Sequence, residues 1–182
     1  HKELIMSSQL RVDKILPVDG APTGGGGGII QVKQTFKTDI TTISANGSFQ
    51  DISGLSVSIT PKFSTSKIMI MFTVSNGGSS TGTTHGIRIV RDSTAVGIAD
   101  ASSSRGRATV GEYTAHSNTT NTQTIVSSVF IDSPATTSAT TYKLQHVASN
   151  GATAYINRSG EFLDQADHPV STSHITVMEL SA

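Results

Sequence analysis

Apolar and polar residues alternate with a period of two along much of this chain, and this alternation limits the fold more than any other feature. It is clearest at Leu55, Val57 and Ile59, which are separated by Ser56 and Ser58. A period of two places successive side chains on opposite faces of a β-strand, one buried and one in solvent. No segment from residue 29 onward has a convincing helical period, so the pattern predicts an all-β domain.

Several other segments have the length and composition of strands. They are Ile29–Phe36, Lys67–Val74, Gly86–Arg91, Thr122–Asp132, Thr140–Ala148, Ala152–Arg158 and His174–Leu180. Residues that favour turns separate them at intervals of roughly 8 to 12 residues, which is typical of two packed antiparallel sheets. We therefore expect an antiparallel β-sandwich that is jelly-roll-like and carries an extended N-terminal arm.

Two local patterns refine this expectation. The segment Lys67–Val74 reads KIMIMFTV and is apolar on both faces, which fits a strand covered on two sides by a second sheet or by a neighbouring subunit. Met69 and Met71 would form the second face, so they are the predicted subunit interface. The dipeptide Asn150-Gly151 adopts positive φ at little cost and lies between two strand-like segments, which predicts a hairpin there.

The composition argues against several classes of partner. The chain has 182 residues and 13 basic against 13 acidic side chains, which removes the electrostatic reason to expect nucleic acid as a partner. No apolar stretch approaches the ~20 residues that span a bilayer, so no membrane insertion is expected. Charged residues are only 14% of the chain, and 51 serines and threonines supply the polar surface instead. So weakly charged a surface favours strand edges that are paired in an oligomer.

The sequence divides into three parts. Residues 1–23 differ in composition from the rest and are interpreted as an N-terminal arm. Residues 24–28 are an unbroken glycine run, which acts as a flexible linker because glycine has no packing preference of its own. Residues 29–182 form the predicted β-sandwich domain.

Motifs for catalysis or metal binding are absent from the sequence. The glycine run follows a proline and precedes a strand, whereas phosphate-binding loops follow a strand and open a helix. The histidines lack metal-ligand spacing, although His168 lies beside Asp167 and Asp164, and His146 alternates with Leu144 and is expected to be buried or at an interface. No nucleophile elbow or carboxylate pair is apparent. We therefore expect no enzyme activity, no cofactor and no metal.

The sequon-like triplets at Asn46, Asn118 and Asn157 carry little weight, because a chain so rich in Ser and Thr produces them by chance. A cluster of basic residues in the middle of the chain is expected to pair with acids across strands or between subunits. It comprises Arg88, Arg91, Arg105 and Arg107.

Several strings in the chain resemble a family of phage tail-fibre and related virion fibre domains that is common among marine phages. They are IIQVKQTFKTD (Ile29–Asp39), DISGLSVSITPKFSTSKIMIM (Asp51–Met71), RDSTAVGIAD with SRGRA (Arg91–Ala108), FIDSPATTSATTYKLQ (Phe130–Gln145) and HITVMEL (His174–Leu180). The arm segment Ser7–Gly20 also resembles the short lead-in that precedes such domains. The segment HKELI before Met6 departs from this lead-in, and Met6 would make a natural start.

The resemblance implies a homotrimeric protein at the surface of a virion, with exposed loops that face the host. The arm would dock onto other virion proteins through its apolar residues Leu10, Val12, Ile15, Leu16 and Val18. The loops Asn76–Thr84 and Gly111–Asn121 would bind a host-surface glycan or protein.

Three residues of the second loop are the candidate receptor-binding side chains, namely Tyr113, His116 and Asn118. Tyr113 offers a flat apolar face with a hydroxyl group, and Asn118 offers both a donor and an acceptor. The rival hypothesis is a capsid-decorating protein or fibre joint with a purely structural role. A carbohydrate-active or metal-using sandwich enzyme is a third and weaker alternative.

Overall fold

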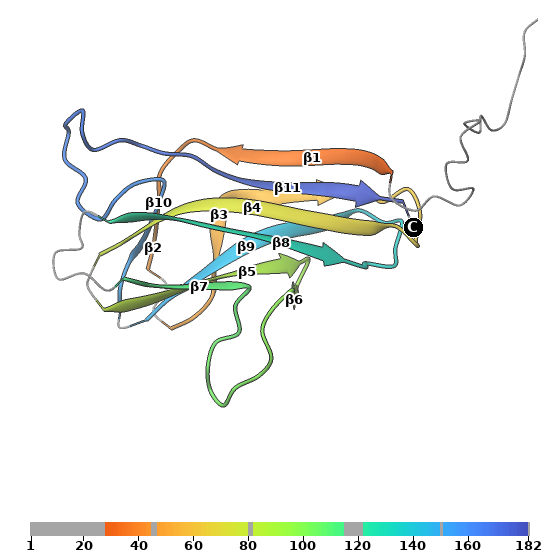
Figure 1. Ribbon diagram of the computed structural model, residues 1–182, viewed down its shortest axis with the longest axis horizontal. Helices are drawn as coiled ribbons and strands as arrows, with labels where there is room; N and C mark the ends of the chain where they lie inside the picture. The colour runs from red at the N-terminus through yellow and green to blue at the C-terminus, as the bar shows by residue number, and fades with distance from the viewer. Residues whose placement is uncertain (1–27, 45–46, 80–81, 115–121, 150, 182) are drawn as a thin grey trace, which may run out of the picture.

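The computed structural model describes residues 28–44, 47–79, 82–114, 122–149 and 151–181. Its strands are, in chain order, β1 (Ile29–Lys37), β2 (Thr41–Ile43), β3 (Gln50–Ile59), β4 (Lys67–Gly78), β5 (Thr83–Arg91), β6 (Thr94–Val96), β7 (Val110–Thr114), β8 (Gln123–Asp132), β9 (Thr140–Ala148), β10 (Ala154–Ile156) and β11 (Ser173–Leu180). They form two antiparallel sheets packed face to face (Figure 1). The predicted all-β, jelly-roll-like sandwich is confirmed, while the N-terminal arm lies outside the described residues.

Sheet neighbours come from distant parts of the chain. The six-stranded sheet has the order β1-β11-β4-β10-β2, with β8 on the other side of β4. The five-stranded sheet has the order β3-β9-β5-β6, and β7 also pairs with β5. The chain therefore crosses repeatedly from one sheet to the other, as in a jelly roll.

The core lies between the two sheets and follows the alternation of the sequence. On β4 the side chains of Ile68, Ile70, Phe72 and Val74 are buried, while the residues between them are only partly covered. Strand β9 supplies Tyr142, Leu144 and other inward residues from the opposite sheet. Burial of such side chains contributes about 1.5–3 kcal/mol each, so this layer is the main source of stability.

A partly buried ion pair joins the sheets at the edge of the core. Arg91 Nη1 lies 2.9 and 2.8 Å from the two carboxylate oxygens of Asp132, and the Tyr142 hydroxyl donates to the same carboxylate at 2.7 Å. This confirms the expected pairing with an acid for Arg91. Arg88 instead donates to Gln145, at 2.9 Å.

The other two arginines of the cluster form no ion pair with an acid among the described residues. Arg105 and Arg107 bind Ser102 and the carbonyl of Ala99, within the loop at residues 97–109 that projects away from the sandwich (Figure 1).

A buried carboxylate fastens the loop between β3 and β4 to β11. Glu179 accepts hydrogen bonds from the amides of Lys62 and Phe63 at 2.6 and 3.4 Å and from Gln31 Nε2 at 2.6 Å. Burial raises the pKa of the Glu179 carboxyl, but these hydrogen bonds to the charged form outweigh burial and leave the pKa below its ordinary value.

Some local predictions differ from the structure. No hairpin forms at Asn150-Gly151, because β9 belongs to the five-stranded sheet and β10 to the six-stranded one. The turn there carries the chain between sheets, with Gly151 at φ 65° and the Ala152 amide bonded to the carbonyl of Ser149 at 3.1 Å. Three short strands, β2, β6 and β7, were not expected.

The sandwich has two distinct ends. Gly28 and Ser181 are bonded to each other at one end, through the Ser181 amide and the Gly28 carbonyl at 2.9 Å. The loop between β10 and β11 lies at the opposite end (Figure 1). No helix in the described part of the chain is long and apolar enough to cross a membrane.

Candidate functional site

The outer face of the six-stranded sheet is uncharged over four adjacent strands, β8, β4, β11 and β1, and seven of the twelve outward positions named below are apolar. The pairing registers place its outward residues in three rows of four. The rows are Ile131-Met69-Met178-Val32, Val129-Met71-Thr176-Gln34 and Ser127-Thr73-His174-Phe36. None of these positions holds Asp, Glu, Lys or Arg. We call this surface the outer apolar face.

Several side chains of the outer apolar face stand well out of the sheet. Val129 and Phe36 are 58% and 56% exposed, and Ile125, one step further along β8, is 73% exposed. Phe36 stacks on His174 with the ring centroids 6.4 Å apart. Scattered apolar residues are normal on a protein surface, but a contiguous patch indicates a contact surface.

The opposite sheet presents a different surface. Its outward residues form a network of hydrogen bonds in which Asp51 binds Lys143 and Gln145, each at 2.7 Å. The hydrogen bond from Lys143 lowers the pKa of the Asp51 carboxyl. Ser58 and Thr141 join their hydroxyls at 2.8 Å on the same surface. Charged and hydroxyl groups thus cover the five-stranded sheet in the way expected of a surface in water.

A shallow hollow of ≈ 240 Å³ interrupts the outer apolar face. It is lined on β4 by Met71 and Thr73, on β8 by Val129, and on β11 by His174. The face therefore carries protruding apolar side chains, such as Ile125, next to a depression. A surface with both features can pack closely against other copies of the chain.

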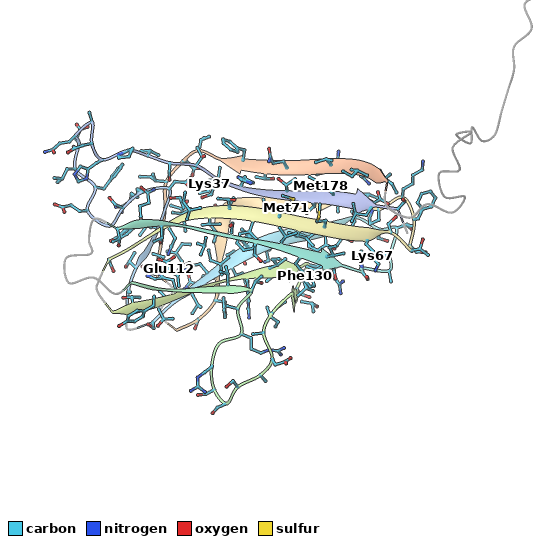
Figure 2. The ribbon with its side chains drawn as sticks, in the orientation of Figure 1. Lys37, Lys67, Met71, Glu112, Phe130 and Met178 are labelled. Atoms are coloured by element: carbon cyan, nitrogen blue, oxygen red, sulfur yellow. The ribbon has the colours of Figure 1, made fainter. Side chains whose placement is uncertain are left out.

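Met69 and Met71, the predicted subunit interface, both lie on the outer apolar face. They are half-buried, and in the described chain no second layer covers them. Met71 on β4 and Met178 on β11 lie on neighbouring strands of the same sheet (Figure 2).

Sequence reasoning missed the rest of this face. The pattern that could have found it is in β8, which has apolar residues on both sides of the strand. Ile125, Val129 and Ile131 point to one side, and Val126 and Phe130 point to the other. A strand with apolar residues on both sides is expected to be covered on both faces.

Of the predicted receptor-binding residues, the structure describes Tyr113, on a strand at the end of the sandwich away from Gly28 (Figure 1). Tyr113 is on β7, pairs with Thr84 on β5 and is 63% exposed. The described ends of the two loops chosen from the sequence therefore lie side by side, because β5 pairs with β7. His116 and Asn118 lie outside the described residues, as do the arm residues Leu10, Val12, Ile15, Leu16 and Val18.

Asn157, the first residue of one sequon-like triplet, has a structural role. Asn157 is fully buried, and its side chain binds the carbonyls of Lys37 and Asp39 at 3.1 and 2.8 Å, so its sequon-like triplet is part of the fold. Among the described residues, no group of three or more His, Cys, Asp or Glu side chains could hold a metal ion.

The chain was compared with known proteins by sequence and by structure. No family model matches it, and no curated protein sequence matches it. One similar solved chain comes from the structure of infectious bursal disease virus, Gx strain, with 14% identity and a TM-score of 0.39. The match covers 84% of this chain and 40% of that one, so this chain spans less than half the length of the viral chain. Membership in the phage fibre family stays a prediction.

Proposed function

We propose that this chain is a homo-oligomeric structural protein of a virion, and that its copies pack through the outer apolar face. The observation that carries the proposal is the contrast between the two outer faces of one sandwich. One is covered by hydrogen-bonded charged and hydroxyl groups, whereas the other exposes Met, Val, Ile and Phe side chains. A free monomer would leave the second face in water, whereas in a trimer the uncharged faces of the three copies turn toward the common axis and cover one another.

The proposed assembly is a trimeric fibre or spike domain. The trimer follows from the resemblance to virion fibre domains. The two ends of the sandwich suit a domain attached at one end, because Gly28 lies at one end and the loop between β10 and β11 lies at the other (Figure 1). The arm, residues 1–23, would dock onto another virion protein, and the far end would face a host-surface glycan or protein. The alternative, a capsid-decorating protein, would use the same subunit contact and bind no host surface.

The mass of the protein in solution tests the subunit contact. Light scattering at micromolar concentration should give three times the monomer mass of 19.0 kDa. Met71→Glu and Val129→Glu each place a carboxylate in the centre of the outer apolar face, where it would be buried without a partner at a cost of several kcal/mol. Both variants should be monomeric.

The matched control is Ser58→Glu, which puts the same carboxylate on an exposed strand position of the other sheet. It should leave the mass unchanged. A wild-type monomer at micromolar concentration, or a Met71→Glu variant that keeps the wild-type mass, would contradict the proposal.

Attachment is tested separately. The wild-type oligomer should bind host cells, and a variant that lacks residues 1–23 should bind them equally well while failing to join the particle. An oligomer that joins the particle but binds no host cell would favour the capsid-decorating alternative.

A further inference from the structure

A polar hollow of ≈ 190 Å³ opens beside the loop between β10 and β11, at the end of the sandwich away from Gly28. It is lined by Gln123 at the start of β8 and by Ser159, Asp167, His168 and Pro169 of the loop. Neither His168 nor Asp167 belongs to the hydrophobic core or to the outer apolar face. The volume is below the ~300–1,000 Å³ of sites for drug-sized ligands, so the hollow suits one small polar unit.

The loop that forms the hollow is held rigidly at its base. Asn157, at φ 68°, binds the carbonyls of Lys37 and Asp39 and accepts a hydrogen bond from Ser173 Oγ at 2.6 Å. Gly77 on β4 lets the loop approach closely, since a Cβ there would lie 2.4 Å from the carbonyl oxygen of Arg158. A preorganised loop keeps the lining in place before a ligand arrives.

The Arg158 guanidinium also helps to hold this loop, through contacts with two aromatic rings and two backbone carbonyls. It lies over the Tyr155 ring, 3.8 Å from the centroid, and over the Phe162 ring at 5.2 Å. Its Nη1 donates to the carbonyls of Ser159 and Gly160 at 3.0 and 3.2 Å. Arg158 therefore supports the loop and is not among the residues that line the hollow.

The lining groups that are left for a ligand include both donors and acceptors. Gln123 uses its amide nitrogen to bind Ser75 Oγ and Ser171 Oγ at 2.8 and 2.6 Å, which leaves its carbonyl oxygen for a ligand. His168 Nδ1 lies 3.4 Å from the Leu163 amide, so Nε2 is the nitrogen left for a ligand. The Asp167 carboxylate forms no hydrogen bond or ion pair with any described residue.

We propose that this hollow binds one neutral hexopyranose unit, such as a surface polysaccharide carries. The proposal rests on the host-attachment function proposed above and names its ligand class. Adjacent sugar hydroxyls both donate and accept, which matches a carboxylate, an amide oxygen and an imidazole nitrogen, and the Pro169 ring offers an apolar edge to the sugar ring. An acidic sugar is disfavoured, because its carboxylate would meet that of Asp167 and the lining includes no Lys or Arg.

The test is a nuclear magnetic resonance titration of the full-length protein, labelled with ¹⁵N, with the neutral methyl glycosides of glucose, mannose, galactose and N-acetylglucosamine. At least one of them should shift the amides of Gln123, Ser159, Asp167 and His168. Asp167→Ala removes a charge-assisted hydrogen bond and should weaken that binding about tenfold or more. His168→Ala should weaken it in the same direction.

The matched control is Asp164→Ala, which removes an exposed carboxylate from the same loop outside the hollow. It should leave the dissociation constant unchanged. The proposal is overturned if none of the four glycosides shifts these amides, if Asp164→Ala weakens binding as much as Asp167→Ala, or if N-acetylneuraminic acid binds more tightly than the neutral sugars.

Failure of this inference can be told apart from failure of the proposed function. Asp167→Ala leaves the outer apolar face untouched and should keep the wild-type mass. An oligomer that dissociates on Met71→Glu but binds none of the sugars would overturn only the sugar site.

Discussion

The imidazoles of His85 and His146 lie against each other between the two sheets. His85 Nδ1 is 3.2 Å from His146 Nε2, and both residues are almost fully buried. Burial lowers the pKa of both side chains; it brings that of His146 to about 3, while nearby Glu112 partly opposes the effect on His85. Both rings are therefore neutral in the folded protein near pH 7.

This pair should make the protein less stable as the pH falls below about 6.5. In that range the unfolded chain takes up protons on both histidines, whereas folded His146 does not until about pH 3. The unfolded state then binds more protons, so the free energy of unfolding falls with decreasing pH, by up to about 1.4 kcal/mol per pH unit for each histidine. Urea denaturation between pH 7 and pH 4 measures this slope.

His146→Leu removes one of the two groups and should reduce the slope by about one proton. An equal slope in both proteins would contradict the assignment. If the variant does not fold, the imidazole resonances of the wild-type protein provide the test, since His146 should stay neutral down to at least about pH 4.

The burial of His146 could be predicted from the sequence, but its partner could not. His146 alternates with Leu144 and Tyr142, and all three are buried in β9, as expected. His85 meets it only because β5 pairs with β9 in the register that aligns Ile87 with His146. That register depends on contacts some 60 residues apart, and no local pattern specifies it.

Among the elements, most of the longer strands could be located from the sequence, whereas three of the four shortest could not. Strands β1, β8, β9 and β11 coincide closely with segments chosen for their strand-like length and composition, and β3 contains the alternating segment Leu55–Ile59 but begins five residues before it. Strands β2 and β6 have three residues each, too few to show a period, and β7 falls in a segment that was interpreted as a binding loop. The Asn-Gly turn after β9 has the chemistry of a hairpin, yet the chain there changes sheets, because turn residues specify a bend and not the strand that follows.

Gly77 links two elements, and its replacement provides a test of their packing. In Gly77→Ala the new Cβ would lie 2.4 Å from the backbone carbonyl of Arg158, and a backbone atom cannot rotate away. We expect a loss of about 1–3 kcal/mol in the free energy of unfolding. Gly111→Ala is the matched control, because its nearest contact would be 3.8 Å, and it should change stability by less than about 0.5 kcal/mol.

Chemical denaturation measures the free energy of unfolding of both variants. Far-ultraviolet circular dichroism follows the transition, because the chain has no tryptophan to serve as a fluorescence probe. Equal stabilities for the two variants would show that β10 and its following loop do not pack on β4 as described.

For the whole molecule, the sequence could indicate that β4 is covered on both of its faces. It could not indicate which residues of other strands extend the second face. The apolar run of β4 predicted two covered faces, and the structure shows that its outward residues continue across β8, β11 and β1. The order of these strands in the sheet is what turns single apolar residues into a continuous surface. Because that order follows from non-local pairing, four separate strings of sequence had to be placed side by side before the outer apolar face could be recognised.

If copies of the chain cover each other's outer apolar face, the thermal stability of the protein must depend on its concentration. Association stabilises the folded state by mass action, so a hundredfold rise in concentration should raise Tm by about 5 °C or more. Met71→Glu should have a lower Tm that does not change with concentration, while Ser58→Glu should follow the wild type. Differential scanning calorimetry over the micromolar range measures all three proteins. A wild-type Tm that is constant over this range would mean that the face is exposed in the folded protein, and the subunit contact proposed for it would be wrong.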